Sequence, residues 1–394
     1  MRLKIRVGSG PIVIRKIYFN FMIKALVPFS GGLDSILVVK ILEEQGIKVI
    51  GLSFDSYFFN SWEAQKMAEQ LGIELLIKDI SRDQLNTVKN PRYGHGNALN
   101  PCIDCHGLMF RVAGELAKLV GEEKKFDLVA TGEVLGQRPF SQNKEALKKV
   151  EKLAGVDILR PLSAKLLSET VYEKKKLVNR SKLLDIAGKS RKRQLELVKK
   201  YGVKYFPSPA GGCRLTENEF GVKVKQLLGN DGKNRELDKV DFELLRIGRH
   251  YWLHQDTRDR RQDTNNSQPP DSKSAFSMQN VQSETNKVKA GKTGFAKRSG
   301  DTVLSSVSSK QPKAHVILGK NHEENQQLKK SAKKNDILIE LKELMGPMAL
   351  IMNRVNLSEE VQKQIILETK KLVLQRAKNP DEKNVEDVEW RVKI

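Results

Sequence analysis

Apolar and polar positions alternate in regular blocks along the first third of the chain. Four short apolar runs are typical of buried strands, and they lie at residues 24–30, 48–56, 73–81 and 126–133. Three longer runs between them carry apolar residues at helical spacing, at residues 34–46, 61–72 and 101–121. Strands that alternate with helices predict an α/β fold with a doubly wound parallel sheet. Ligands of such sheets bind outside the carboxyl ends of the strands.

The pattern changes in the later part of the chain. Residues 173–200 hold eleven Lys or Arg against three acidic residues and repeat apolar positions at helical spacing, which predicts a helical segment with a basic face. Residues 255–314 contain ten serines and few large apolar side chains, so we expect them to be disordered. The runs on either side, 244–253 and 314–325, are typical of strands and indicate a hairpin with a long insertion. A helix-like run at 358–378 and a short strand at 385–394 end the sequence.

Two adjacent glycines follow the first predicted strand, in the sequence Ser30-Gly31-Gly32-Leu33-Asp34-Ser35. A strand that turns through Gly-Gly into a helix presents several free backbone N–H groups to one point. Together with the helix dipole, these groups bind anionic oxygens. The loop therefore predicts a phosphate site, but no lysine follows the glycines as in the G-x-x-x-x-G-K-[ST] loop of nucleoside triphosphatases. A plain strand–helix turn is the simpler alternative.

Charge and cysteine content narrow the function further. The formal net charge is +22, which favours a polyanionic partner such as nucleic acid. Cys102 and Cys105 form a C-x-x-C pair and Cys213 stands alone, so a secreted disulfide framework is excluded and metal or redox chemistry is favoured. Residues 10–29 are apolar but interrupted by Arg15, Lys16 and Lys24, and this stretch is too short and too charged to span a bilayer. Residues 1–21 are expected to be an extension before the first strand. We therefore expect a cytoplasmic protein that begins with an N-terminal extension and does not enter a membrane.

The glycine loop resembles the PP-loop of the ATP pyrophosphatases, which share an adenine nucleotide alpha-hydrolase fold. Within that family, "NPCIDC", "ATGE" and the later "GGC" are similar to the tRNA thiouridine synthetases, or thiouridylases. Cys102 is an addition, and Glu133 stands where those enzymes usually have His. Residues 240–394 resemble an NFACT-type RNA-binding domain through "GRH", "LGKNHEEN" and "GPMAL".

The resemblance implies a complete chemistry. ATP would adenylate a uridine carbonyl oxygen of tRNA, and sulfur would then displace AMP to give thiouridine. ATP and its pyrophosphate would be bound by residues at three strand ends: Ser30, Gly31, Gly32, Asp34, Ser35, Asp55, Thr131 and Gly132. Asp34 would also help to place Mg²⁺ or activate the attacked oxygen. The partners would be tRNA and a sulfur donor, either sulfide or a persulfide carrier.

The cysteines leave three interpretations open. Cys102, Cys105 and Cys213 could bind a 4Fe–4S cluster with an open iron position for sulfide, as in the iron–sulfur branch that the resemblance indicates. Alternatively, Cys105 and Cys213 act as a catalytic pair that carries and resolves a persulfide. The third interpretation is a structural zinc half-site or an inert thiol. His106 could lower the pKa of the Cys105 thiol, although a surface histidine at a helix start is the simpler interpretation. His95 is a further candidate for a metal ligand or RNA contact.

Polar residues beyond the fourth strand suit recognition of a nucleotide or a flipped uridine, and they are Gln137, Arg138 and Gln142. The expected domains are a PP-loop domain at 22–170, a basic helical segment with the third cysteine at 171–239, and a smaller C-terminal α+β domain at 240–394. Alternative functions are amidation or lysidine-type ligation of RNA by an adenylating PP-loop enzyme, and a non-catalytic nucleotide- and RNA-binding scaffold. The sequence leaves open which uridine is thiolated, whether at position 2 or 4, and whether the protein is a homodimer.

Overall fold

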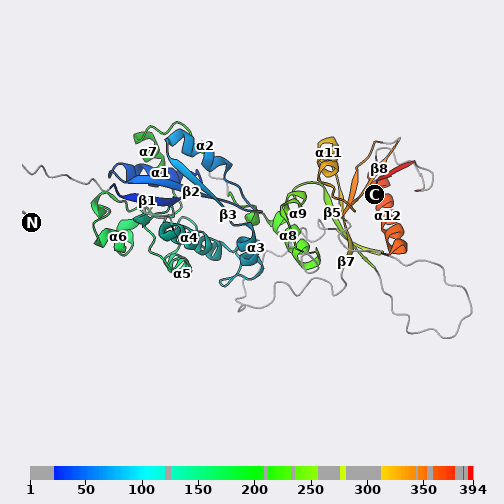
Figure 1. Cartoon of the computed structure of the whole chain (residues 1–394), viewed down its shortest axis with the longest axis horizontal. Helices are drawn as coiled ribbons and strands as arrows, with labels where there is room; N and C mark the ends of the chain where they lie inside the picture. The colour runs from blue at the N-terminus through cyan, green and yellow to red at the C-terminus, as the bar shows by residue number, and fades with distance from the viewer. Residues whose placement is uncertain are drawn as a thin grey trace, which may run out of the picture.

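A computed structural model describes ten stretches of the chain: residues 22–119, 126–207, 212–231, 236–255, 276–280, 312–342, 345–352, 358–377, 385 and 389–393. The expected N-terminal extension, residues 1–21, lies outside them. Two sheets organise these stretches (Figure 1). None of the described helices combines the length and the hydropathy needed to cross a bilayer.

The first sheet is parallel and has the order β3-β2-β1-β4. Its strands are β1 (Lys24–Pro28), β2 (Lys48–Asp55), β3 (Glu74–Asp79) and β4 (Leu128–Val129). Successive residues of β1 point to opposite faces, as in any strand. Ala25 and Val27 therefore join one buried cluster, and Leu26 joins another.

Helices cover both faces of this sheet (Figure 1). One face packs against α1 (Leu33–Glu43), α2 (Trp62–Leu71) and α7 (Lys192–Lys200). The other packs against α4 (Cys102–Leu119), which in turn packs on α5 (Lys144–Ala154). Two glycines in the left-handed region, Gly46 and Gly72, follow the ends of α1 and α2. The predicted doubly wound parallel sheet is confirmed.

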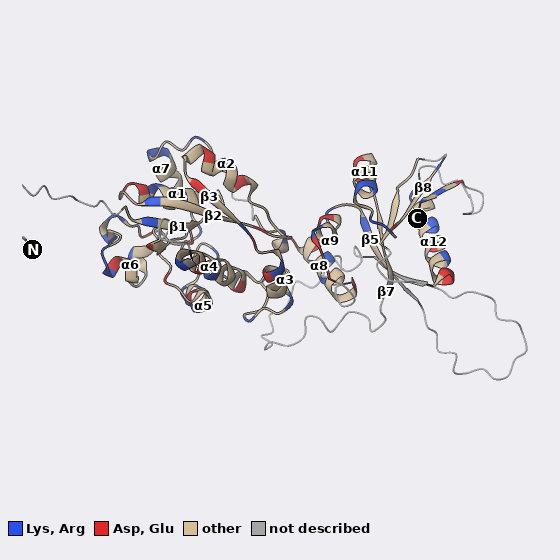
Figure 2. Cartoon of the chain, viewed as in Figure 1, with Lys and Arg blue, Asp and Glu red and all other residues tan. Residues whose placement is uncertain are grey.

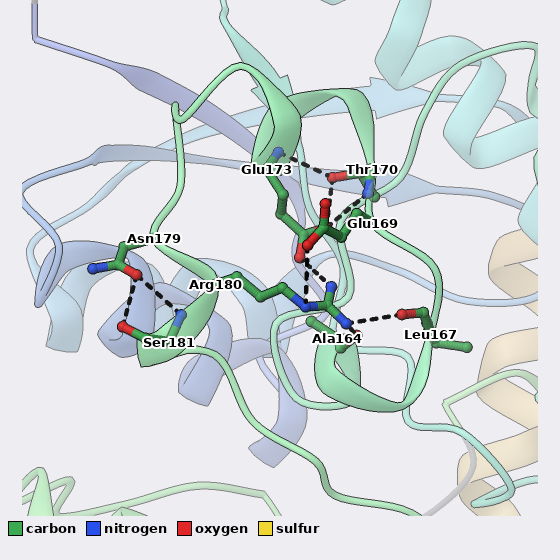
Figure 3. A network of polar contacts seen from close by, with 8 residues as sticks. All are labelled: Ala164, Leu167, Glu169, Thr170, Glu173, Asn179, Arg180 and Ser181. Atoms are coloured by element: carbon green, nitrogen blue, oxygen red, sulfur yellow. Dashed lines mark hydrogen bonds and ion pairs between the residues drawn. The ribbon is translucent and has the colours of Figure 1, made fainter.

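Residues 173–200 do not form one continuous helix. The segment begins at the end of a short helix, α6 (Val171–Lys174), continues through a 3₁₀ turn, η3 (Arg180–Lys182), and ends with α7. Another 3₁₀ turn, η2 (Ala164–Leu166), precedes the segment. Arg180 organises the region: its guanidinium donates to the Glu173 carboxylate at 2.5 Å and to the carbonyl oxygens of Ala164 and Leu167 at 2.8 and 2.9 Å (Figure 3).

The predicted helical segment is thus helical only in part, and several of its apolar positions lie outside the helices. Val178, Leu183 and Ile186 lie buried in the core beside α1, although none of them belongs to an α-helix. Their regular spacing reflected burial in an irregular segment that is fixed by the Arg180 contacts.

The second sheet is antiparallel and has the order β10-β8-β9-β7-β5-β6. Its strands are β5 (Arg249–Gln255), β6 (Phe276–Asn280), β7 (Pro312–Leu318), β8 (Ile337–Leu341), β9 (Ala349–Met352) and β10 (Trp390–Lys393). On one side it packs against α12 (Glu359–Leu374), and on the other against α9 (Lys239–Leu244) and α11 (His322–Ser331). The predicted α+β arrangement of this part is confirmed.

β5 and β7 pair as the flanks of the predicted insertion, with Tyr251 opposite Val316. The prediction of disorder is wrong at Phe276–Asn280, because these residues form β6 and pair with β5. Residues 256–275 and 281–311 lie outside the described residues.

Two histidines are buried within this second sheet. His250 and His315 face each other across β5 and β7, with 3.0 Å between His250 Nδ1 and His315 Nε2. Trp252 stacks on His315 at a centroid distance of 4.2 Å. Burial holds the pKa of His250 well below its usual value, so His250 is neutral in the folded protein.

A third buried cluster joins the two sheets. It combines α3 (Ser81–Lys89) and the loop after β2 with α8 (Asn218–Asn230), α9 and the Trp252 side chain of β5. Phe58 and Phe242 meet edge to face in this cluster, with ring centroids 5.3 Å apart. The cluster matters for function because the residues just before α8 carry Cys213.

Candidate active site

The glycine loop joins β1 to α1, as its sequence predicted. Gly31 has φ of +73°, and a Cβ atom there would lie 2.6 Å from the carbonyl oxygen of Glu63, so only glycine fits without strain. Gly32 precedes the first turn of α1, and the Ser35 hydroxyl donates to its carbonyl at 2.8 Å. Ser30 Oγ lies 3.3 Å from the Gly32 nitrogen. The backbone N–H groups at the start of α1 thus face the carboxyl edge of the sheet.

Thr131 and Gly132 lie beside this loop, at the end of β4. Thr131 is buried, and its backbone N–H donates to Leu159. A Cβ atom on Gly132 would lie 2.8 Å from the backbone of Asp34 and of Ser35. The two strand ends therefore touch at Gly132, which the sequence alone could not place.

Asp34 points into a chain of amide side chains. Gln137 Nε2 donates to Asp34 Oδ2 at 2.7 Å, and Gln194 Nε2 donates to Gln137 Oε1 at 3.1 Å. Burial raises the pKa of the Asp34 carboxyl, while the Gln137 bond and the charges of Arg191 and Arg138 oppose that rise. Asp34 Oδ1 is buried and accepts no hydrogen bond from the described residues. An unfilled carboxylate oxygen beside a phosphate loop is a suitable ligand for Mg²⁺.

Asp55 also lies at a carboxyl strand end, but its contacts are local. Asp55 Oδ1 accepts a 2.7 Å hydrogen bond from the backbone of Ser61, just before α2. Ser61 in turn precedes Trp62, the first residue of that helix. The described contacts thus give Asp55 a part in holding this loop, and its predicted role in binding nucleotide stays a prediction.

The three cysteines come together even though Cys213 is more than 100 residues from the other two. Cys105 is buried near the start of α4, and Gln84 Nε2 donates to its sulfur at 3.1 Å. Burial raises the pKa of the Cys105 thiol, and the neighbouring Cys213 and Cys102 raise it further. Burial likewise raises the pKa of Cys213 to about 11. All three cysteines are free thiols.

Packing of α8 delivers Cys213 to this place. Cys213 contacts the cluster of Phe58, Leu85 and Phe220, and the Arg214 backbone N–H donates to the Phe58 carbonyl at 3.2 Å. The approach of the three sulfurs depends on that contact between distant parts of the chain.

The thiols match an iron–sulfur cluster in chemistry, because thiolates are its usual ligands. Their arrangement does not match one: among the described residues, no three Cys, His, Asp or Glu side chains converge closely enough to hold a metal ion. The cluster therefore stays a prediction, and no reaction step below passes through it.

The two candidate histidines, His106 and His95, each pair with an oxygen atom. His106 Nδ1 lies 2.8 Å from Glu133 Oε1, so this ring pairs with a carboxylate and not with Cys105. His95 Nε2 lies 2.9 Å from the Val88 carbonyl, a contact between the loop and α3. In this structure neither histidine ring pairs with one of the three cysteines.

Glu133 is the centre of a buried polar network. Arg160 Nε donates to Glu133 Oε2 at 3.0 Å, and Arg160 also pairs with Glu151 of α5. Although burial opposes ionisation, the contacts with His106 and Arg160 hold the pKa of Glu133 below its usual value. Glu133 thus ties the end of β4, next to Gly132, to the helix that carries Cys105.

Arg138 connects the two halves of the site. It follows Gln137 directly and is exposed, and its positive charge lowers the pKa of both Asp34 and Cys213. A cation thus lies within electrostatic reach of both the phosphate loop and the thiols. Gln142, the third predicted recognition residue, is buried and holds the turn through its backbone carbonyl, which accepts from Gly136 at 2.8 Å.

Sequence reasoning missed three residues of this site. Asp104 accepts hydrogen bonds from the backbone of Arg92 and Tyr93, which fixes the loop before α4. Gln84 binds the Cys105 sulfur, and no local signal marked it. Gln194 is fully buried on the core-facing side of α7. A polar residue at an apolar helical position was the signal that could have identified it.

Residues 23–154 match the protein family described as "tRNA methyl transferase HUP domain". The N-terminal part of the chain is therefore similar to a HUP domain. The match ends within α5, and it includes the phosphate loop, Cys102, Cys105 and Glu133, but not Cys213.

Several curated relatives of the chain are named tRNA-specific 2-thiouridylases. The tRNA-specific 2-thiouridylase MnmA 3 of Bacteroides fragilis is 34% identical over 113 residues, which cover 28% of this chain and 30% of that protein. The MnmA protein of Helicobacter pylori is 36% identical over 122 residues, covering 28% and 34%. The MnmA protein of Stutzerimonas stutzeri is 26% identical over 251 residues, covering 58% and 61%. The chain thus spans less than two thirds of the length of each relative.

Two solved structures are also similar. One is a 4-thiouridine synthetase–RNA complex with bound ATP, which is 22% identical with a TM-score of 0.28 and covers 44% of this chain and 50% of that one. The other is a predicted subunit of a tRNA methyltransferase from Methanocaldococcus jannaschii, 16% identical with a TM-score of 0.29, covering 46% and 90%. These TM-scores are too low to support a conclusion about this chain.

Proposed function

We propose that this protein is an ATP-dependent tRNA sulfurtransferase that converts a uridine to thiouridine. One observation supports the proposal: Cys213 lies within electrostatic reach of the distant pair Cys102 and Cys105, and the Arg138 charge acts on both Cys213 and Asp34 of the glycine loop. The names of the curated relatives of the HUP domain support the same substrate class.

The reaction has two steps. The uridine carbonyl oxygen attacks the α-phosphorus of ATP, and the bond to the β-phosphate breaks to release pyrophosphate. The backbone N–H groups at Gly31 and Gly32 and the dipole of α1 would hold that pyrophosphate. Mg²⁺, with Asp34 Oδ1 as a ligand, would supply positive charge to the phosphates.

A sulfur nucleophile then attacks the activated carbon of the base. AMP leaves with the electron pair of the carbon–oxygen bond, and the carbon–sulfur bond takes its place. Cys105 and Cys213 form the sulfur-handling site in this proposal, and Arg138 stabilises negative charge on Cys213. Sulfide would attack the carbon directly. A persulfide carrier would instead pass its outer sulfur to one of the two thiols. That sulfur attacks the carbon, and the other thiol then breaks the S–S bond, which leaves a Cys105–Cys213 disulfide for an external thiol to reduce.

In this proposal Cys105 and Cys213 carry and resolve a persulfide. The 4Fe–4S cluster predicted on all three cysteines is the alternative form of the protein. Anaerobic purification with iron and sulfide assays distinguishes them, since only the second form contains iron.

A reconstituted assay tests the function. Purified protein, unmodified tRNA, ATP, Mg²⁺ and a sulfur donor should yield AMP, pyrophosphate and thiouridine, which mass spectrometry of nucleosides detects. Cys213→Ala should abolish thiouridine but leave tRNA affinity unchanged. Amidation or lysidine-type ligation would survive this substitution, and a binding scaffold would split no ATP. ATP cleavage without any thiolated base would contradict the proposal.

A further inference from the structure

An exposed aromatic patch lies at the start of α2, beside the phosphate loop. It consists of Trp62, Lys66 and Tyr205, and we refer to it as the Trp62 patch. Trp62 is 62% exposed and Tyr205 is 41% exposed, although large aromatic side chains are usually covered. Lys66 Nζ lies 4.3 Å from the Tyr205 ring centroid and 5.7 Å from that of Trp62. The Lys66 ammonium group therefore makes cation–π contacts with both rings, and neither ring is packed in the core.

The patch has a fixed position relative to the phosphate loop. Asp55 anchors the Ser61 backbone, and Asn60 Oδ1 accepts from the Trp62 backbone N–H at 3.2 Å. The next residue, Glu63, has its carbonyl where a side chain on Gly31 would lie. Trp62 thus sits one residue from the point at which α2 touches the loop.

Tyr205 reaches the patch from the segment after α7. Gln70 Nε2 of α2 donates to the Tyr205 carbonyl at 3.2 Å, which holds this segment against α2. α2 and α7 lie on the same side of the sheet (Figure 1). Two elements separated by more than 100 residues therefore build one surface.

The surroundings of the patch are strongly basic. Residues 189–206 contain seven Lys or Arg and one acidic residue. Lys and Arg residues lie along α7 (Figure 2). Protein interfaces are depleted in lysine at their centres, whereas aromatic rings within a positive surface are typical of sites for single-stranded nucleic acid.

We propose that the Trp62 patch stacks an unpaired base of the RNA substrate, close to the uridine that enters the phosphate-loop site. The inference rests on the proposed function, because it names where a neighbouring nucleotide of that substrate binds. Every base has an aromatic face, so stacking orders the strand without selecting its sequence. Lys66 and the basic segment neutralise the phosphates on either side.

Equilibrium binding of tRNA and of a single-stranded oligouridine to the full chain tests this inference. Trp62→Ala should weaken binding of both about tenfold, and Trp62→Phe should restore most of the affinity because a ring remains. Leu166→Ala is the matched control, since Leu166 is a 41% exposed apolar side chain on η2, outside the Trp62 patch. Its affinity should equal that of the wild type.

Tryptophan fluorescence gives an independent readout. RNA should quench the emission of the wild type. Of the other two tryptophans, Trp252 is buried and Trp390 is half-buried, so the quenching should be clearly smaller in Trp62→Phe. Equal RNA affinity of Trp62→Ala and wild type, or unchanged quenching in Trp62→Phe, would overturn the inference. Neither readout requires thiolation, so a failed sulfurtransferase assay and a failed stacking test remain distinguishable.

Discussion

At Gly132, even the addition of one methyl group is expected to weaken ATP binding. An added methyl group would lie 2.8 Å from the backbone of Asp34 and Ser35, which must shift to make room. Gly132→Ala should therefore displace the first turn of α1 and weaken ATP binding by about tenfold or more, since about 1.4 kcal/mol suffices for that factor. Isothermal titration with ATP measures it.

The thermal unfolding midpoint of Gly132→Ala serves as the control, because it separates a local shift from loss of the fold. Wild-type ATP affinity in a folded Gly132→Ala protein would show that this contact does not position the loop.

The raised pKa of the Cys213 thiol leads to a second prediction at the scale of single residues. Burial raises its pKa from 9.0 to about 11. At pH 8 the reactive thiolate fraction is then about 100 times smaller than for an ordinary thiol. In iron-free protein, iodoacetamide should alkylate Cys213 about 100-fold more slowly than a cysteine in an unstructured peptide, and the rate should rise as the pH approaches 11. Peptide mass spectrometry over time measures both rates, and equal rates would contradict the burial of this thiol.

At the scale of elements, Glu133 links β4, α4 and α5. Its folded-state pKa is lowered, so it contributes stability above the unfolded value of 4.5, and this contribution is lost as the pH falls below that value. Glu133→Gln leaves Arg160 with one less acceptor in a buried place and should cost about 3 kcal/mol of unfolding free energy at pH 7. Urea unfolding measures the change.

The loss from Glu133→Gln should shrink as the pH is lowered from 4.5 through the folded-state pKa, because wild-type Glu133 then loses its charge as well. Glu145→Gln on the exposed surface of α5 provides the comparison and should change stability little. A pH-independent difference would mean that charge on Glu133 does not hold these elements together.

The elements also show how far the sequence could be interpreted. Periodicity and apolar runs identified α1, α2, α4 and their strands, because α2 carries its buried residues on one face while α1, β1 and β2 are buried almost throughout. Periodicity failed at residues 173–200, where the spacing arose from separate buried side chains around Arg180. It also missed β6, since the residues of an edge strand need few apolar side chains.

For the whole molecule, the net charge of +22 predicts salt-dependent binding of tRNA. Each phosphate that a Lys or Arg neutralises releases counterions, so affinity falls as salt rises. With six or more phosphate contacts, affinity should drop by about 10³ between 50 and 200 mM salt. Filter binding at constant Mg²⁺ measures the slope, and a flat dependence would exclude a phosphate-tracking surface. The NFACT-type character of the C-terminal part stays a prediction.

The sequence by itself determined the alternating strands and helices, the phosphate loop and the basic character, because each depends on residues that are neighbours in the chain. Only the tertiary structure decided which side chains meet. Cys213 reaches Cys105 through packing of α8 on Phe58, and Gln194 reaches the Asp34 network through packing of α7 on the sheet. Such contacts depend on how buried surfaces fit across distant segments, and no local pattern records that fit.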